Sequence, residues 1–112
     1  MQKQRLAEHL KRYHMGAAAA ATSRELERAF SMTGKDLRGT VNRLRRDGVP
    51  IASSGSGYYY AATEQEVRAT IAHLTRRISG IAAAIHGLTR SLEQFDAAQT
   101  RLFDDTLGGD GL

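Results

Sequence analysis

The spacing of apolar residues in the first half of the chain predicts three short helices. Apolar side chains recur three or four positions apart over residues 2–13, 23–30 and 34–47, which is the period of an amphipathic helix. The expected inward stripes are Leu6, Leu10 and Tyr13 in the first helix, Leu26 and Phe30 in the second, and Leu37, Val41 and Leu44 in the third.

Residues that start and stop helices lie at the edges of these segments. Thr22 and Thr33 precede the second and third helices, and each is followed three residues later by an acidic residue. Each threonine is therefore expected to cap a helix N-terminus. Gly48 follows the third helix, and Pro50 prevents that helix from resuming. The five alanines at 17–21 fit a loop, a short extended piece or a helical turn.

A β-hairpin is predicted directly after the third helix. The runs VPIAS and YYYAA are rich in strand-forming residues, and they flank the loop Ser54–Gly57, where glycine supplies positive φ angles. Strand alternation sends Tyr58 and Tyr60 to one face and Tyr59 to the other. We expect the tyrosines of one face or the other to cover the core rather than to stack on bases.

A heptad pattern fills the remaining sequence. After a capping box at Thr63 and Glu66, apolar residues recur at alternating steps of four and three as far as Leu102, interrupted only by Gln99. This repeat predicts a coiled-coil helix over residues 64–103, about 60 Å long. One small domain cannot bury so long a stripe, so a partner helix is required. Antiparallel dimers, parallel dimers and tetramers all remain open. The predicted oligomerisation residues are Val67, Ile71, Leu74, Ile78, Ile81, Ile85, Leu88, Leu92 and Phe95.

Charge divides the chain where the heptad pattern begins. Residues 1–62 contain 11 lysines and arginines against 5 acidic residues, whereas residues 63–112 contain 5 against 7. A basic half suits a polyanionic partner. The chain has no cysteine, which excludes disulfides and thiolate metal sites. It also lacks an apolar run near the roughly 20 residues of a membrane span. We expect a soluble protein of the bacterial cytoplasm that makes no membrane contact.

The order of elements predicts a mainly α fold with a small β-hairpin wing. Two helices joined by about three residues, the second of them basic, followed by a hairpin, indicate a winged helix-turn-helix over residues 1–62. Residues 63–104 would form the oligomerisation helix, and residues 105–112 a disordered acidic, glycine-rich tail. Arginine reads guanine edges, asparagine reads adenine, and lysine contacts phosphate. The candidate DNA-binding residues are Ser23, Arg24, Thr33, Lys35, Arg38, Asn42, Arg43, Arg46, Ser54, Ser56 and Tyr58.

The stretch LRRDGVPIASSGSGYYYAATEQE, residues 44–66, resembles small winged-helix proteins of bacteriophages and prophages. The shared pattern is L-R-x-x-G-[IV]-P-I-x-S-S…G-Y-Y-x-A, followed by a capped helix. Proteins of that kind are DNA-binding factors in phage replication or transcription control. The resemblance therefore implies a DNA-binding role for the N-terminal half.

Sequence alone favours a sequence-specific, double-stranded DNA-binding protein that acts as a homodimer, first of all a phage-type transcriptional regulator. A replication-origin or packaging-site recognition factor needs the same surface. A protein-interaction adaptor that blocks a host factor is the alternative from another class. No acid–base pair or nucleophile can be assigned, and the four histidines lack partners at zinc-ligand spacing. We therefore expect no enzymatic activity, no metal or other cofactor, and no small-molecule substrate.

Overall fold

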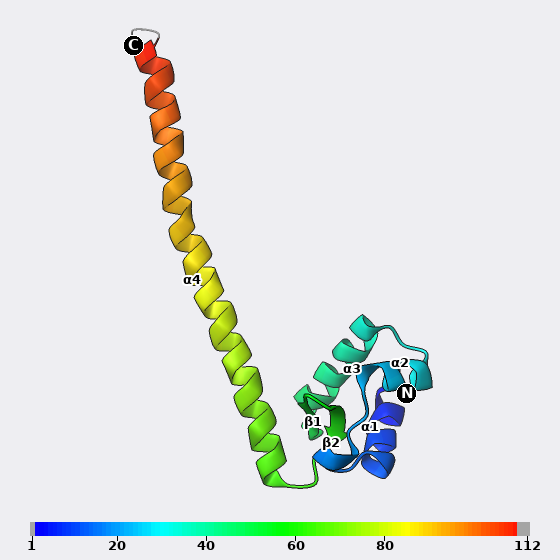
Figure 1. Ribbon diagram of the computed structural model, residues 1–112. Helices are drawn as coiled ribbons and strands as arrows, with labels where there is room; N and C mark the ends of the chain where they lie inside the picture. Colours follow the sequence, from blue (N-terminus) through cyan, green and yellow to red (C-terminus); the bar gives the residue numbers. More distant parts are fainter. Residues whose placement is uncertain (1, 110–112) are drawn as a thin grey trace. The chain divides into compact units, whose positions relative to one another are not determined.

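The computed structural model describes the backbone of residues 2–109 and the side chains as far as Asp96. Its elements run in the order α1 (Gln2–Tyr13), a 3-10 turn η1 (Ala17–Ala19), α2 (Ser23–Phe30), α3 (Gly34–Arg46), β1 (Ile51–Ser54), β2 (Gly57–Tyr60) and α4 (Glu64–Gly109) (Figure 1). The predicted fold class is confirmed, because a mainly α chain carries a β-hairpin after the third helix and then a long C-terminal helix.

The hydrophobic core lies between α1, α2, α3 and the hairpin. Its buried members are Leu6, Leu10, Ala21, Leu26, Leu37, Val41, Leu44 and Ile51. The predicted inward stripe of α3 is confirmed. The prediction for Tyr13 is wrong, because its side chain is 58% exposed. Tyr13 is the last residue of α1, and its ring lies against His9 at a centroid distance of 5.2 Å. The ring therefore packs at the end of the helix and not in the hydrophobic core.

Both predicted threonine caps are present. Thr22 precedes α2, and its hydroxyl oxygen accepts a hydrogen bond from the Glu25 amide at 3.2 Å. Thr33 precedes α3 and accepts a hydrogen bond from the Asp36 amide at 3.1 Å. Each cap satisfies a backbone donor that the helix itself leaves without a partner. The two caps therefore fix where α2 and α3 begin, with only three residues between the helices.

The C-terminal end of α3 explains why the first strand starts later than predicted. Gly48 has a φ of 89°, and the Val49 amide donates back to the Leu44 carbonyl at 2.9 Å. This is a Schellman closure, in which the left-handed residue is usually glycine. Val49 is therefore committed to the helix end, and β1 begins at Ile51.

The hairpin is tighter than the predicted four-residue loop. Ser54 pairs with Gly57 in the antiparallel register, so only Gly55 and Ser56 connect the strands. The Ser54 hydroxyl accepts a hydrogen bond from the Ser56 amide at 3.2 Å, a local bond that stabilises tight turns. The prediction extended the second strand to Ala62, but the strand ends at Tyr60.

Strand β2 has backbone partners on both of its edges. One edge pairs with β1. On the other edge, Ala21 and Tyr58 exchange two backbone hydrogen bonds of 2.8 Å, and the Gly16 amide donates to the Tyr60 carbonyl at 2.8 Å. The alanine segment is thus a 3-10 turn followed by extended backbone at Ala20 and Ala21, and Ala21 forms the bridge to Tyr58. Both edges of β2 are occupied, which leaves no free edge at this strand.

The three tyrosines divide between two faces, as the alternation predicts. Tyr58 and Tyr60 are half-buried against the main core. Tyr59 points the other way and is only 3% exposed. Its hydroxyl hydrogen-bonds to the Thr70 side chain, while burial and the nearby carboxylate of Glu66 raise the pKa of Tyr59. Both faces of the hairpin therefore contribute to folding.

The first turns of α4 belong to the compact N-terminal unit. The Glu66 carboxylate accepts hydrogen bonds from the Ala62 amide at 2.7 Å and from the Ala17 amide at 2.9 Å. Thr70 is buried, and its hydroxyl oxygen accepts a hydrogen bond from the Ser53 amide at 3.3 Å. These contacts lie within the first of the chain's two compact units, Met1–His73.

The C-terminal helix is also longer than predicted. It continues to Gly109 instead of ending near residue 103. The predicted tail at 105–112 is therefore helical in its first part, and the rest of that prediction concerns residues 110–112, which lie outside the described residues. Within residues 2–109, no helix has both the length and the hydropathy needed to cross a membrane.

Replacing Gly57 with alanine is expected to destabilise the fold. Gly57 has a φ of 126°, and a Cβ built on it would overlap the Ala21 carbonyl group. Strain at such a position costs on the order of 1–3 kcal/mol. Gly55→Ala in the same turn is the control, because a Cβ there meets nothing within 4 Å. Thermal unfolding followed by circular dichroism should show a clear drop for the first variant only, and equal melting temperatures would contradict the close approach of Ala21.

Replacing Glu66 with glutamine is expected to lower stability at neutral pH, and the loss should disappear in acid. Backbone hydrogen bonds from Ala17 and Ala62 hold the pKa of Glu66 below its ordinary range. Since that pKa is lower in the folded chain, the carboxylate stabilises the fold above the unfolded-chain pKa. This contribution is lost as pH falls through the folded-state value.

The matched control for this experiment is Glu64→Gln, which removes a second acidic residue from the first turn of α4. Melting temperatures should be compared between neutral pH and the acidic range below the ordinary glutamate pKa. The difference in melting temperature between the wild type and Glu66→Gln should shrink in acid. If it stays constant, the carboxylate charge does not supply the stabilisation.

Candidate nucleic-acid interface

The outer face of α3 is polar and open to solvent. Leu37, Thr40, Val41 and Leu44 are buried on its inner face. Thr40 is a member of the inner face that the apolar spacing did not predict. Its hydroxyl donates to the Asp36 carbonyl at 2.8 Å, so the side chain enters the core without an unpaired polar group. The candidate contact residues of this helix are all exposed, namely Lys35, Arg38, Asn42, Arg43 and Arg46.

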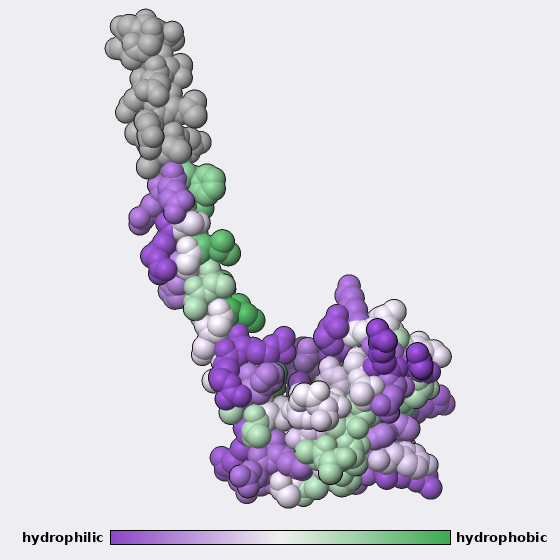
Figure 2. Space-filling view, viewed as in Figure 1, coloured by the Kyte–Doolittle hydropathy of each residue, from purple (hydrophilic) through white to green (hydrophobic). Residues whose placement is uncertain are grey.

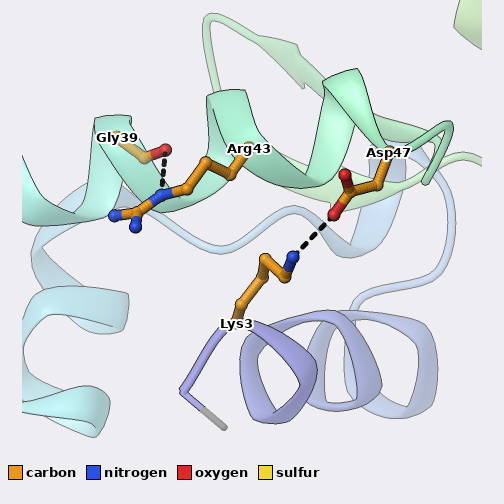
Figure 3. A network of polar contacts seen from close by, with 4 residues as sticks. All are labelled: Lys3, Gly39, Arg43 and Asp47. Carbon is orange, nitrogen blue, oxygen red and sulfur yellow. Dashed lines mark hydrogen bonds and ion pairs between the residues drawn. The ribbon is translucent and has the colours of Figure 1, made fainter.

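Three of these side chains follow one line along the helix. Arg38, Asn42 and Arg46 are spaced four residues apart, so they lie on the same side of α3. Arg43 lies beside this line, and its Nε donates to the Gly39 carbonyl at 3.4 Å (Figure 3). That contact is long and solvent-exposed, so the guanidinium keeps most of its donors available.

Gly39 is not required by the packing of this chain. A Cβ placed on it would lie 3.8 Å from Arg43 Nη2, which is an ordinary van der Waals contact. Glycine inside a helix costs roughly 1 kcal/mol relative to alanine. The isolated chain therefore gives no packing reason for a glycine at this position.

An ion pair holds the C-terminal end of α3 against α1. Lys3 Nζ lies 2.7 Å from the Asp47 carboxylate (Figure 3). Both side chains are partly exposed, so the pair itself adds little stability. It does neutralise Asp47, the acidic residue closest to the arginines at this end of the helix.

Two candidate residues at the N-terminal ends of α2 and α3 already have partners. The Thr33 hydroxyl caps α3, as described above. The Ser23 hydroxyl donates to the Glu27 carboxylate at 2.7 Å. A Cβ on Gly34 would lie 3.4 Å from Arg38 Nη1 and 3.6 Å from Glu27 Oε2, so an acidic group lies near Arg38. Arg24, by contrast, is exposed at the start of α2.

The hairpin tip presents small polar groups. Ser54 and Ser56 are exposed, whereas Tyr58 is half-buried at the end of the strand pair. The Ser54 hydroxyl is used within the turn as an acceptor, which leaves its proton available for donation. The structure thus places two hydroxyls at the tip and packs most of the Tyr58 ring on the core.

Arg45 has a structural position that the sequence analysis did not identify. Its Nε donates to the Ile51 carbonyl at 2.8 Å, and its Nη2 donates to the Ser53 hydroxyl at 3.1 Å. These bonds join the last turn of α3 to β1. Only its spacing in the sequence could have indicated this role. Arg45 lies eight residues after the buried Leu37 and therefore borders the inner face of α3. The arginine that joins helix to hairpin is therefore distinct from the solvent-facing ones.

His9 and His14 form a group of ring contacts at the end of α1. His9 stacks against Phe30 edge-on and lies 5.2 Å from the His14 ring. Burial, together with the charge of His14, lowers the pKa of His9. In the part of the chain that the structure describes, no three histidine, aspartate or glutamate side chains gather in a group that could hold a metal ion.

A second candidate surface is the apolar stripe of α4. Seven of its predicted members are between 56% and 68% exposed: Ile71, Ile78, Ile81, Ile85, Leu88, Leu92 and Phe95. Val67 and Leu74 are half-buried. Figure 2 shows hydrophobic side chains along one side of this helix and hydrophilic ones along the other. Continuous exposed stripes of this size mark association surfaces, so the structure indicates self-association and is consistent with a coiled coil.

Comparisons of the chain with protein-family models, with curated proteins and with solved structures gave no match. What is established for the chain is its architecture, which consists of three helices, an antiparallel hairpin and a long C-terminal helix. The resemblance of residues 44–66 to phage winged-helix proteins stays a prediction.

Placing aspartate at Ile81 is expected to abolish association through the stripe. A carboxylate buried in an apolar seam without a partner costs several kcal/mol. The control is Ala83→Asp, two residues further on, where the side chain lies on the side of the helix away from the stripe. Molar mass from light scattering should fall to that of one chain only for Ile81→Asp. Equal masses for the two variants would show that the stripe does not hold the assembly together.

Proposed function

We propose that the chain is a sequence-specific, double-stranded DNA-binding protein that reads the major groove with the outer face of α3. The observation that carries this proposal is the exposure of five polar and basic side chains on that face, opposite the buried stripe. The helix follows a three-residue turn after α2 and precedes a hairpin, which is the element order of a winged helix-turn-helix. The basic charge of residues 1–62 supports a polyanionic partner.

The chemistry of each side chain supports a division of roles. Arg43 carries paired donors that match the two acceptors of a guanine edge, and Asn42 carries a donor and an acceptor that match an adenine edge. Lys35, in the first turn of α3, is suited to a phosphate, because the helix N-terminus adds a favourable dipole. The hydroxyls of Ser54 and Ser56 at the hairpin tip would contact the backbone as a wing.

The process served by this binding is proposed to be transcription control in a phage or prophage. The support is the resemblance of residues 44–66 to small winged-helix proteins of that origin. One domain of this size makes few base contacts, so two copies joined through α4 would gain affinity from two half-sites. Recognition of a replication origin or a packaging site would use the same surface.

A second candidate function is a protein-interaction adaptor that blocks a host factor. The observation that favours it is the exposed stripe of α4, which accepts any helix with matching apolar spacing. An adaptor has no need for the exposed basic face of α3. Binding to DNA therefore decides between the two functions.

Replacing Arg43 with alanine tests the proposed surface. On a site selected from a random duplex library, we expect a loss of about 1–3 kcal/mol in binding free energy if Arg43 reads a base. The control is Arg76→Ala, which removes the same charge from α4, where the side chain is exposed. Binding of the wild type should also weaken steeply with added salt, because phosphate contacts release counterions.

Fluorescence anisotropy with the selected and with scrambled duplexes distinguishes the outcomes. An equal loss on both duplexes would make Arg43 a phosphate contact rather than a base contact. If the wild type binds no duplex even at low salt, the proposed function is wrong and the adaptor remains.

A further inference from the structure

The uninterrupted apolar stripe of α4 can be bounded from burial and sequence. Ile71 is its first strongly exposed member, and Phe95 is its last apolar member before the polar Gln99 interrupts the repeat. Val67, one step earlier, is half-buried and lies within the N-terminal unit. The uncovered apolar face is therefore centred on residue 83. An occupant needs an apolar stripe of the same length and spacing to cover it completely.

We propose that a second copy of this chain covers the stripe by running antiparallel, with Ile71 opposite the partner's Phe95. This inference rests on the self-association contained in the proposed function, and it adds the direction and the register. Heptad position a faces position d in an antiparallel pair. With Ile71 at position a, Ile78 then lies opposite the partner's Leu88. Every a and d residue from 71 to 95 then lies opposite an apolar residue of the partner.

The distribution of charge along α4 supports this direction. Residues 68–77 contain three arginines and no acidic residue, whereas residues 93–96 contain two acidic residues and no basic one. The proposed register brings Arg68 to the level of the partner's Asp96, and symmetry makes this pair twice. A parallel pair in register would instead place each stretch beside its own copy, which brings like charges together.

The residues at the midpoint support a close pairing. Ala82 and Ala84 occupy positions e and g, which flank the seam, and both are exposed small side chains. They lie on either side of residue 83, where the two-fold axis would cross the pair. Ala82 would then lie beside the partner's Ala82, so the helices can approach each other there without bulky or charged groups between them.

This direction has a consequence for DNA binding. Ile71 and the partner's Ile71 would be 24 residues apart along the pair, about 36 Å at 1.5 Å per residue. The two N-terminal units would be joined to opposite ends of the paired segment. The half-sites would then be separated, instead of lying side by side as a parallel pair would require.

Cross-linking of the full chain tests the direction. The wild type has no cysteine, so a single introduced thiol is the only reactive one. Ala82→Cys and Thr89→Cys change two exposed residues at the same heptad position, and a short bis-maleimide is the probe. We expect the first variant to form covalent dimers. The second should not, because the two introduced thiols would be separated by 14 residues along the pair, or about 21 Å.

A mixture of Thr89→Cys with Thr75→Cys should restore the covalent dimer, since these positions face each other in the proposed register. Intact-mass spectrometry identifies the mixed product. Equal cross-linking of Ala82→Cys and Thr89→Cys would overturn the antiparallel direction. Failure of both the Ala82→Cys variant and the mixture to cross-link would also overturn it.

Light scattering on the same samples separates the failure of the inference from that of the proposed function. A dimer mass without the expected cross-links overturns the direction alone. A monomer mass overturns self-association as well. In neither case is DNA binding through α3 overturned, because the anisotropy comparison with Arg43→Ala tests it separately.

Discussion

Burial of Leu37, Val41 and Leu44 sets the rotation of α3 about its own axis, and the candidate surface depends on that rotation. With these three side chains in the core, a helix of 3.6 residues per turn must direct Arg38 and Asn42 outward. Other contacts hold this orientation at the C-terminal end of the helix, where Arg45 joins β1 and Asp47 meets α1. A weaker core would therefore let α3 rotate and misalign its basic side chains, even if the residues of the basic face were unchanged.

The hairpin connects this helix to the rest of the chain. Strand β2 is hydrogen-bonded to β1 on one edge and to the segment before α2 on the other. Its second face is covered by the first turns of α4, through Tyr59 and Thr70. Glu66 adds a tie to the Ala17 amide. One short strand thus links elements from the beginning, middle and end of the N-terminal unit, which makes that unit a single folding domain despite its small core.

Local sequence signals predicted most of the fold, and long-range contacts explain what they missed. Helical periodicity and threonine caps located α1, α2 and α3, because both act within a few residues. The start of β1 was misplaced because the Val49 amide donates a hydrogen bond to the Leu44 carbonyl at the end of α3. The bond from Ala17 to Glu66 joins residues 49 positions apart, and no pattern in the sequence signals it. For the candidate site, the buried apolar stripe of α3 predicted which of its side chains are exposed. It did not predict the hydrogen bond from the Ser23 hydroxyl to the Glu27 carboxylate.

The two surfaces of this chain have opposite requirements, and their separation on different helices follows from that. In the proposed function, the basic face of α3 would stay hydrated until it meets phosphates, because desolvating unpaired charges is costly. The stripe of α4 must leave water to contribute any free energy. If both surfaces lay on one helix, hydration of the basic face would oppose removal of the apolar stripe from water. Under the proposed function, with the surfaces on separate helices of one chain, pairing through α4 would make the second α3 contact intramolecular. Association through the apolar surface would then strengthen binding through the charged one, although no residue serves both.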